Sequence, residues 1–143
     1  MQLVGTCAGA EVYDDYAHNP EKLHAMIATL QEKHERGVAV LWRPHGYGPL
    51  RKMMDGLVAM FAETLRPQDR LLLLPVYDAG GTADRSVNSD ALAIRVKGSV
   101  CVETPDEAAR FLKAHAPAFG AIVTAGARDP GLPVLARQLA GKE

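Results

Sequence analysis

The stretch VAVLW, residues 38–42, and the loop RPHGYGP that follows it, residues 43–49, decide the fold. An uninterrupted apolar run of this length is typical of a strand buried on both faces, as in parallel sheets that helices cover on both sides. The loop leads into a helical pattern over 50–65, and the apolar run of 70–76 predicts another buried strand. Alternating strand and helix patterns favour an α/β fold with right-handed crossovers.

The alternation continues in both directions from this stretch. Towards the C-terminus we expect strands at 99–103 and 118–124, and helices at 89–96, from Thr104 onward and at 131–139. Towards the N-terminus, short strands at 3–7 and 11–16 around Ala8-Gly9-Ala10 indicate an antiparallel hairpin. Asn19-Pro20-Glu21 predicts a helix start, since Asn19 can cap and Pro20 fits the first helical position; Gly37 predicts its stop. We therefore expect one α/β domain, a mostly parallel sheet with helices on both faces and a short N-terminal hairpin.

Composition narrows the class of protein. The chain has 143 residues, 48% of them hydrophobic, and a net charge of −1, which is typical of a single globular domain and gives no reason to expect nucleic acid or an anionic membrane as partner. No apolar run approaches the length of a membrane span, and the first ten residues do not resemble a signal peptide. Cys7 and Cys101 have no paired spacing, so we interpret them as reduced core thiols of a cytoplasmic protein.

Polar residues that could bind a ligand follow the ends of the predicted strands. Parallel sheets of this class bind ligands at the carboxyl ends of their strands, so these loops should share one edge. The candidates are Asp15, His18 and Asn19 after 11–16, Arg43, His45 and Tyr47 after 38–42, Asp78 after 70–76 and Asp129 after 118–124. Each has a structural alternative: Asp15 could cap a turn, His18 could bond its own loop, and Asn19 is better explained as a helix cap than as a ligand.

Several signatures of complete active sites are missing from the sequence. It contains no G-x-x-x-x-G-K-[ST] phosphate loop, no G-x-G-x-x-G fingerprint and no G-x-S-x-G nucleophile elbow. Phosphoryl transfer needs a phosphate cradle and magnesium ligands, and the sequence supplies neither. His18, His45 and Asp15 match no defensible zinc spacing, so no metal site is predicted.

Four segments resemble one known family. DDYAHNP at 14–20 closely resembles the D-D-Y-[AG]-H-x-P segment that opens the C-terminal domain of Mur ligases. RPHGY at 43–47 is similar to Q-P-H-R-Y of the branch that joins L-alanine to UDP-N-acetylmuramate, and LPVYDAGG at 74–81 and TAGARD at 124–129 resemble that branch's D-V-Y-x-A-G/R-E and M-G-A-G-D. These segments occur in the family's order and span essentially the whole chain.

The resemblance implies a fold and a reaction. Mur ligases have a UDP-sugar-binding domain, a central ATP-binding domain with a phosphate loop, and a C-terminal domain folded like a doubly wound, Rossmann-like dinucleotide-binding domain. The last domain closes over ATP and brings the amino acid, whose amine attacks an acyl phosphate. The family's D-D-Y-x-H segment faces the nucleotide and the reaction centre, a role that falls here on Asp15 and His18, while His45 would face the amino acid and the phosphates. ATP and Mg²⁺ would be held mainly by the central domain.

The sequence departs from the family pattern where the substrate would bind. Gly46 and Pro49 stand where the branch has arginines, and a guanidinium fork is the usual clamp for a carboxylate. Arg43, where the family has glutamine, or Arg51 could compensate. The L-alanine specificity of the branch therefore does not follow from the sequence.

Three interpretations remain open. We expect residues 1–143 to be the C-terminal domain of a peptidoglycan-precursor ligase without its N-terminal and central domains, partnered in the whole enzyme by those domains, a small amino acid and a UDP-sugar acceptor. Alone it should fold cooperatively but release no phosphate from ATP. The alternatives are a stand-alone non-catalytic domain that binds a nucleotide, an amino acid or a partner, and an unrelated small α/β enzyme.

Overall fold

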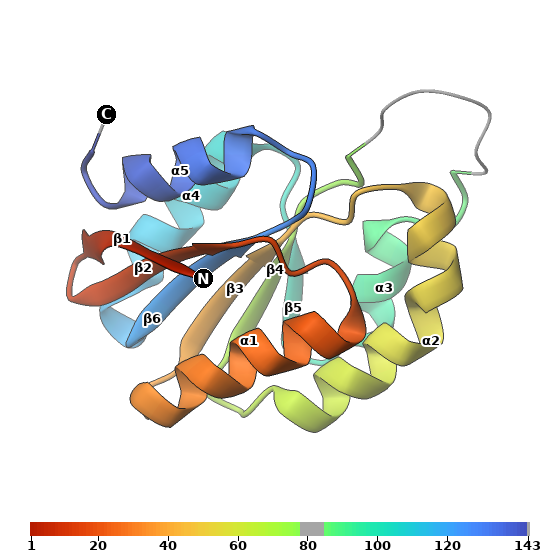
Figure 1. Ribbon diagram of the computed structural model, residues 1–143, viewed down its shortest axis with the longest axis horizontal. Helices are drawn as coiled ribbons and strands as arrows, with labels where there is room; N and C mark the ends of the chain where they lie inside the picture. The colour runs from red at the N-terminus through yellow and green to blue at the C-terminus, as the bar shows by residue number, and fades with distance from the viewer. Residues whose placement is uncertain (78–84, 143) are drawn as a thin grey trace.

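A six-stranded sheet lies between two layers of helices in the computed structural model, which describes residues 1–77 and 85–142 (Figure 1). Its strands run in the order β1-β2-β6-β3-β4-β5. The bounds of the strands are β1 Gln2–Cys7, β2 Ala10–Asp15, β3 Val38–Trp42, β4 Arg70–Leu73, β5 Ser99–Cys101 and β6 Ala121–Ala125. All neighbouring strands pair in parallel except β1 and β2, which are antiparallel, so the predicted mostly parallel sheet with an N-terminal hairpin is confirmed.

The helices divide between the two faces of the sheet. Helices α1 Pro20–Lys33, α2 Tyr47–Thr64 and α3 Ser89–Arg95 cover one face, and α4 Pro105–His115 and α5 Gly131–Leu139 cover the other (Figure 1). A short 3₁₀ turn, Ala116–Ala118, follows α4. Among the described residues, no helix is long and apolar enough to cross a membrane.

Strand β3 shows why the apolar run of 38–42 decides the fold. Val38, Val40 and Trp42 pack into the core beneath α1 and α2, whereas Ala39 and Leu41 pack into the core beneath α4 and α5. All of them are fully buried, so the strand has no face for a polar side chain. Alternate residues of one strand thus supply both cores, and each core buries apolar area that stabilises the fold by about 25 cal/mol per Å².

Helix starts follow the caps that the sequence indicates. The side chain of Asn19 accepts a hydrogen bond from the amide of Lys22 at 2.8 Å, and that of Thr104 accepts one from the amide of Glu107 at 3.1 Å. The hairpin turns at Ala8 and Gly9, whose φ angles of 47° and 93° are left-handed, as tight two-residue turns require.

Some expected boundaries are wrong. Helix α2 begins at Tyr47 rather than near residue 50, because Pro49 sits in the first turn, where a missing backbone N–H costs no hydrogen bond. Strand β4 ends at Leu73, short of Pro75, and β6 begins only at Ala121 because residues 116–118 form the 3₁₀ turn around Pro117. Helix α1 ends at Lys33, before Gly37. Gly37 instead directly precedes β3 and has a φ of 132°.

The expectation about the two cysteines needs correction. Cys7 and Cys101 are free thiols but only half-buried, at the margins of the cores rather than within them. His34 is the C-terminal cap residue of α1, and its Nε2 lies 3.1 Å from a carboxylate oxygen of Glu11. His24 is exposed, yet its Nδ1 lies 2.8 Å from the hydroxyl oxygen of Thr64, so it links α1 to α2.

Candidate functional site

The carboxyl ends of three central strands meet at one edge of the sheet. Asp15 at the end of β2 and Trp42 at the end of β3 both pair with Ala125 at the end of β6. The loops that follow these strands therefore start side by side, and Figure 1 shows them leaving the sheet at the same edge before they diverge towards α1, α2 and α5. The structure brings together the sequence-predicted residues Asp15, His18, Arg43, His45 and Asp129 at this carboxyl edge.

The loop after β2 is ordered by its own polar groups. Oδ1 of Asp15 accepts a hydrogen bond from the amide of Tyr16 at 2.6 Å, and Nδ1 of His18 lies 3.1 Å from the carbonyl oxygen of Tyr16. Ala17 is buried and anchors the loop, while Tyr16 is 76% exposed. Asn19 is engaged as the cap of α1. The second carboxylate oxygen of Asp15 and the far nitrogen of His18 are thus the groups of this loop best placed for a ligand.

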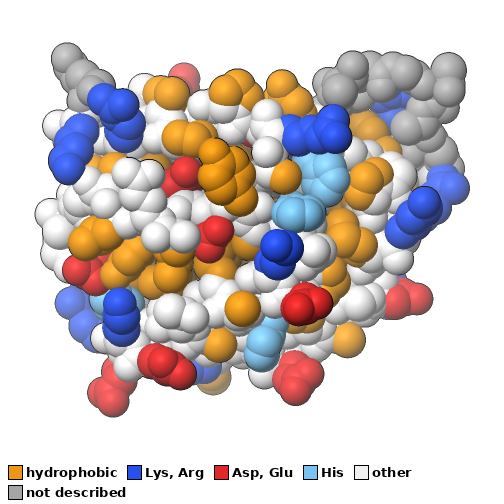
Figure 2. Space-filling model, viewed as in Figure 1, with side chains coloured by type: hydrophobic (Ala, Val, Ile, Leu, Met, Phe, Trp, Pro, Cys, Tyr) orange, Lys and Arg blue, Asp and Glu red, His pale blue; other side chains and the backbone are white. Residues whose placement is uncertain are grey.

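His18 and His45 face each other across the edge. Their ring centroids lie 5.6 Å apart with an interplanar angle of 81°, an edge-to-face contact that joins the loops after β2 and β3. Burial lowers the pKa of His45, and the positive charges of His18 and Arg128 lower it further. Figure 2 shows histidine side chains gathered on this part of the surface beside basic ones. The pair therefore favours a neutral imidazole at His45.

The Nδ1 atom of His45 is buried without a hydrogen-bond partner among the residues that the structure describes. Leaving a buried polar atom unpaired costs about 1–3 kcal/mol, and most such atoms in folded proteins are paired. An unpaired imidazole nitrogen beside Arg128 is suited to a polar or anionic group, since the imidazole can donate or accept a hydrogen bond and the guanidinium supplies positive charge.

Arg43 and Asp129 are bonded to each other. Nη1 of Arg43 donates to Oδ2 of Asp129 at 2.9 Å, and its Nε donates to the carbonyl oxygen of Pro75 at 2.9 Å. Oδ1 of Asp129 accepts from the amide of Gly131 at 2.8 Å, at the start of α5. The side chains are 19% and 10% exposed, so the ion pair is largely shielded from water and ties the loop after β3 to the last helix.

Tyr47 and Asp78 complete the sequence-predicted set. Tyr47 lies in the first turn of α2, and the guanidinium carbon of Arg85 lies 5.6 Å from the centre of its ring. Asp78 falls outside the described residues. Within residues 1–77 and 85–142, no group of three or more His, Cys, Asp or Glu side chains is arranged to hold a metal ion.

A hollow of about 350 Å³ opens beside the loop after β2. Asp15 and His18 line it, together with Lys22, Met26 and Thr29 from α1. Sequence reasoning missed Lys22, although its position four residues after His18 and in the first turn of the helix that His18 precedes was a usable signal. Its ammonium group adds positive charge to the same side of the site.

Asp14, the neighbour of Asp15, has a structural role. Its Oδ1 accepts a hydrogen bond from the hydroxyl of Thr124 at 2.6 Å, which ties β2 to β6. Burial raises the pKa of Asp14, and the bond from Thr124 opposes that rise. Asp14 therefore stabilises the pairing of β2 with β6, whereas its neighbour Asp15 lines the hollow.

Comparison with known proteins places this geometry in one family. The family described as Mur ligase, glutamate ligase domain matches residues 1–128. The UDP-N-acetylmuramate–L-alanine ligase of Koribacter versatilis is 32% identical over 135 residues, which cover 94% of this chain and 26% of that protein. The enzyme of the same name from Sinorhizobium medicae is 33% identical over 97 residues, 68% of this chain and 20% of that protein.

Solved structures of Mur ligases have a similar fold. A crystal structure of UDP-N-acetylmuramate–alanine ligase from Thermotoga maritima superposes with a TM-score of 0.66 at 19% identity, covering 98% of this chain and 28% of that one. This chain thus spans only 20–28% of the length of these relatives and of that neighbour. The chain belongs to the Mur ligase family and corresponds to the C-terminal domain of its members.

Proposed function

We propose that this chain acts as the C-terminal domain of an ATP-dependent, amide-bond-forming ligase of peptidoglycan precursor synthesis. In this role it closes over ATP held by a central domain and presents a small amino acid to an acyl phosphate on a UDP-sugar acceptor. The observation that carries the proposal is the pairing of His18 with His45 at the carboxyl edge, with Nδ1 of His45 buried and unpartnered.

The chemistry of the carboxyl edge fits phosphate and hydroxyl groups. Imidazole nitrogens of His18 and His45 and the guanidinium of Arg128 can hydrogen-bond or attract phosphate oxygens. The carboxylate of Asp15 accepts hydrogen bonds and suits a ribose hydroxyl or an ammonium group. Lys22 adds a cation at the rim of the hollow. The carboxyl edge therefore contains hydrogen-bond donors for anions and an acceptor for hydroxyl or amine groups.

This chain's residues would act by binding, orientation and exclusion of water. A neutral His45, whose pKa burial lowers, can take a proton from an incoming ammonium group, and deprotonation is what makes an amine nucleophilic. Holding the amine next to the acyl group also increases the reaction rate, because the two reactants no longer have to meet by diffusion. Magnesium coordination is assigned to the other domains, whose phosphate loop this sequence lacks.

The ion pair between Arg43 and Asp129 limits how far Arg43 can bind a substrate carboxylate. Because Arg43 is bonded to Asp129 and to the carbonyl oxygen of Pro75, its guanidinium already has two strong partners. It is therefore a poor replacement for the family arginines at Gly46 and Pro49 as a clamp on an amino-acid carboxylate. We propose L-alanine or another small amino acid as substrate, held with fewer charged contacts than in the branch that carries those arginines.

The test compares the full-length ligase containing this domain with the chain alone. With ATP, magnesium, UDP-N-acetylmuramate and L-alanine, the whole enzyme should release phosphate, and the isolated chain should release none above buffer. Asp15→Ala and His18→Ala should each slow turnover by roughly 10- to 150-fold, the loss of one hydrogen bond to a charged group at the transition state.

Glu32→Ala is the matched control, since Glu32 is exposed on α1 away from the site. The proposal fails if Asp15→Ala and His18→Ala turn over like Glu32→Ala while melting at the wild-type temperature. Sustained phosphate release by the isolated chain would likewise contradict it. A whole protein that binds ATP or an amino acid without turnover would instead support a non-catalytic binding domain.

A further inference from the structure

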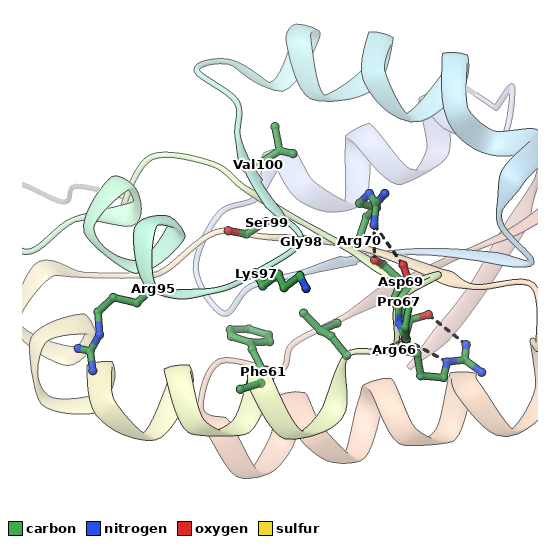
Figure 3. A pocket seen from close by; sticks show the side chains of 12 residues that line it. Phe61, Arg66, Pro67, Asp69, Arg70, Arg95, Lys97, Gly98, Ser99 and Val100 are labelled. Atoms are coloured by element: carbon green, nitrogen blue, oxygen red, sulfur yellow. Dashed lines mark hydrogen bonds and ion pairs between the residues drawn. The ribbon is translucent and has the colours of Figure 1, made fainter.

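A second pocket lies at the opposite, amino edge of the sheet. It has a volume of about 780 Å³, within the range of about 300–1,000 Å³ typical of small-molecule sites. The end of α2, the turn into β4 and the loop between α3 and β5 enclose it (Figure 3). No residue of the carboxyl-edge site lines this amino-edge pocket. It is therefore a separate feature from the ligase site proposed above.

Basic side chains surround the amino-edge pocket, but most of them are already engaged. Arg66 forms a forked contact with the buried carboxylate of Asp69, at 3.1 Å and 3.0 Å, and it points away along the end of α2 (Figure 3). Arg95 at the other end bonds Asp55 at 3.0 Å. Arg70 donates only to backbone carbonyl oxygens, so its positive charge has no paired carboxylate among the described residues.

Lys97 differs from these arginines. It lies in the middle of the pocket, its side chain running above Phe61 in Figure 3. No hydrogen bond or ion pair joins its ammonium group to any of the residues that the structure describes, and Asp69, the acidic lining residue, is taken up by Arg66, Gln31 and the amide of Val38. Lys97 and Arg70 thus leave a net positive field in the pocket.

The walls of the pocket are largely apolar. Ala62 and Leu65 of α2 and Val100 of β5 line it, with the fully buried Phe61 beneath them. The carbonyl groups at the end of α2 do not compete for a ligand, because Phe61 O accepts from the amide of Leu65 and Thr64 O accepts from Gln31. Apolar walls below a single unpaired ammonium group suit a molecule with one anionic group and an apolar body.

We propose that the amino-edge pocket is a binding site for an organic monoanion with an aromatic or acyl body. The anion pairs with Lys97 in the field of Arg70, and the apolar body lies against Ala62, Leu65 and Val100. Such a ligand completes the charge pairing of Lys97 and covers apolar surface in one step. Binding there is independent of ATP and of the residues at the carboxyl edge.

Fluorescence titration of this chain with anilinonaphthalene sulfonate, an aromatic monoanion, tests the proposal. One dye should bind per chain, and neutral N-phenylnaphthylamine should bind much more weakly. Lys97→Met keeps most of the apolar stem and removes the charge, so it should weaken dye binding about tenfold, as the loss of one charge-assisted hydrogen bond would. Lys113→Met on the exposed side of α4 is the matched control and should bind the dye like the wild type.

A second variant guards against a change in folding. Ala62→Glu places a carboxylate on an exposed helical position that lines the pocket, so it should also weaken dye binding. In the wild type, octanoate should compete with the dye. Melting temperatures of both variants should stay near that of the wild type. The proposal is overturned if Lys97→Met and Ala62→Glu bind the dye unchanged, if the neutral dye binds equally well, or if no saturable binding occurs.

Discussion

The ion pair between Arg43 and Asp129 should contribute measurably to the stability of the domain. Arg43→Met keeps the apolar stem and removes two charge-assisted hydrogen bonds, at 2.9 Å to Asp129 and 2.9 Å to Pro75. Each is worth about 1.5–3 kcal/mol where water is largely excluded, and the side chains are only 19% and 10% exposed. We expect a loss of about 3 kcal/mol in the free energy of unfolding, or about 10 °C in melting temperature for a domain of this size.

A double-mutant cycle isolates the pair itself. Asp129→Asn keeps an oxygen for the amide of Gly131, so the cycle of Arg43→Met with Asp129→Asn measures mainly the lost ion pair. The coupling energy should be about 1.5–3 kcal/mol by urea unfolding. The cycle of Arg95→Met with Asp55→Asn is the control, since that pair is 47% and 93% exposed and should couple far more weakly.

Two outcomes would refute this reasoning. Equal coupling energies for the two pairs would mean that the shielding of Arg43 and Asp129 adds nothing. Arg43→Met could also melt like the wild type but lose turnover in the full-length ligase. Arg43 would then be a ligand-binding residue, as the sequence suggested, rather than a structural residue that links the loop after β3 to α5.

Three further predictions concern single residues. Asp69→Asn should destabilise the fold by about 3 kcal/mol at pH 7, because it breaks a buried, hydrogen-bonded charge. Burial would raise the pKa of Asp69, but hydrogen bonds, chiefly those from Arg66, hold this pKa below its usual value. The stabilisation by the Asp69 carboxylate is therefore present above about pH 4–5, and urea unfolding should show it shrinking as the pH falls below about 4. Gly37→Ala should cost at least about 2 kcal/mol by thermal melting, since φ is 132° and a Cβ would lie 2.5 Å from the carbonyl oxygen of Gln68; an unchanged melting temperature would contradict this. His45→Phe should raise the melting temperature slightly, by removing a buried unpaired nitrogen, while it abolishes turnover of the full-length ligase; a variant that is active would show that the nitrogen has no role.

Local signals in the sequence predicted most of the secondary structure. The apolar run of 38–42 fixed a strand with no exposed face, and Asn19-Pro20 marked the start of α1 through a cap that the structure contains. The start of α2 was missed because Tyr47 precedes two helix-breaking residues, Gly48 and Pro49, whose placement in the first turn removes their usual cost. Propensity alone does not distinguish those positions from a loop.

The sequence predicted which edge of the sheet the candidate residues share, but it did not predict how their side chains pair. The rule that ligands bind at the carboxyl ends of parallel strands brought His18 and His45 to the same edge, and their rings do face each other. That Arg43 would bond Asp129 across 86 residues of sequence was not predictable, because nothing local to either residue selects the other. The Asn19 side chain is taken up by capping, which the sequence had favoured over ligand binding.

The position of β6 has a consequence for the synthesis of the protein. Of the strands that the structure describes, β6 is synthesised last, yet it lies between β2 and β3, and the hydroxyl of Thr124 donates to the carbonyl oxygen of Tyr13, 111 residues earlier in the sequence. Until β6 emerges, β2 and β3 have no partner between them, and at about 5–20 residues per second that interval lasts several seconds or more. Unpaired strand edges invite association with other chains. A nascent or prematurely terminated chain that lacks β6 should therefore aggregate or be degraded, because the sheet is completed only when residues 121–125 are available.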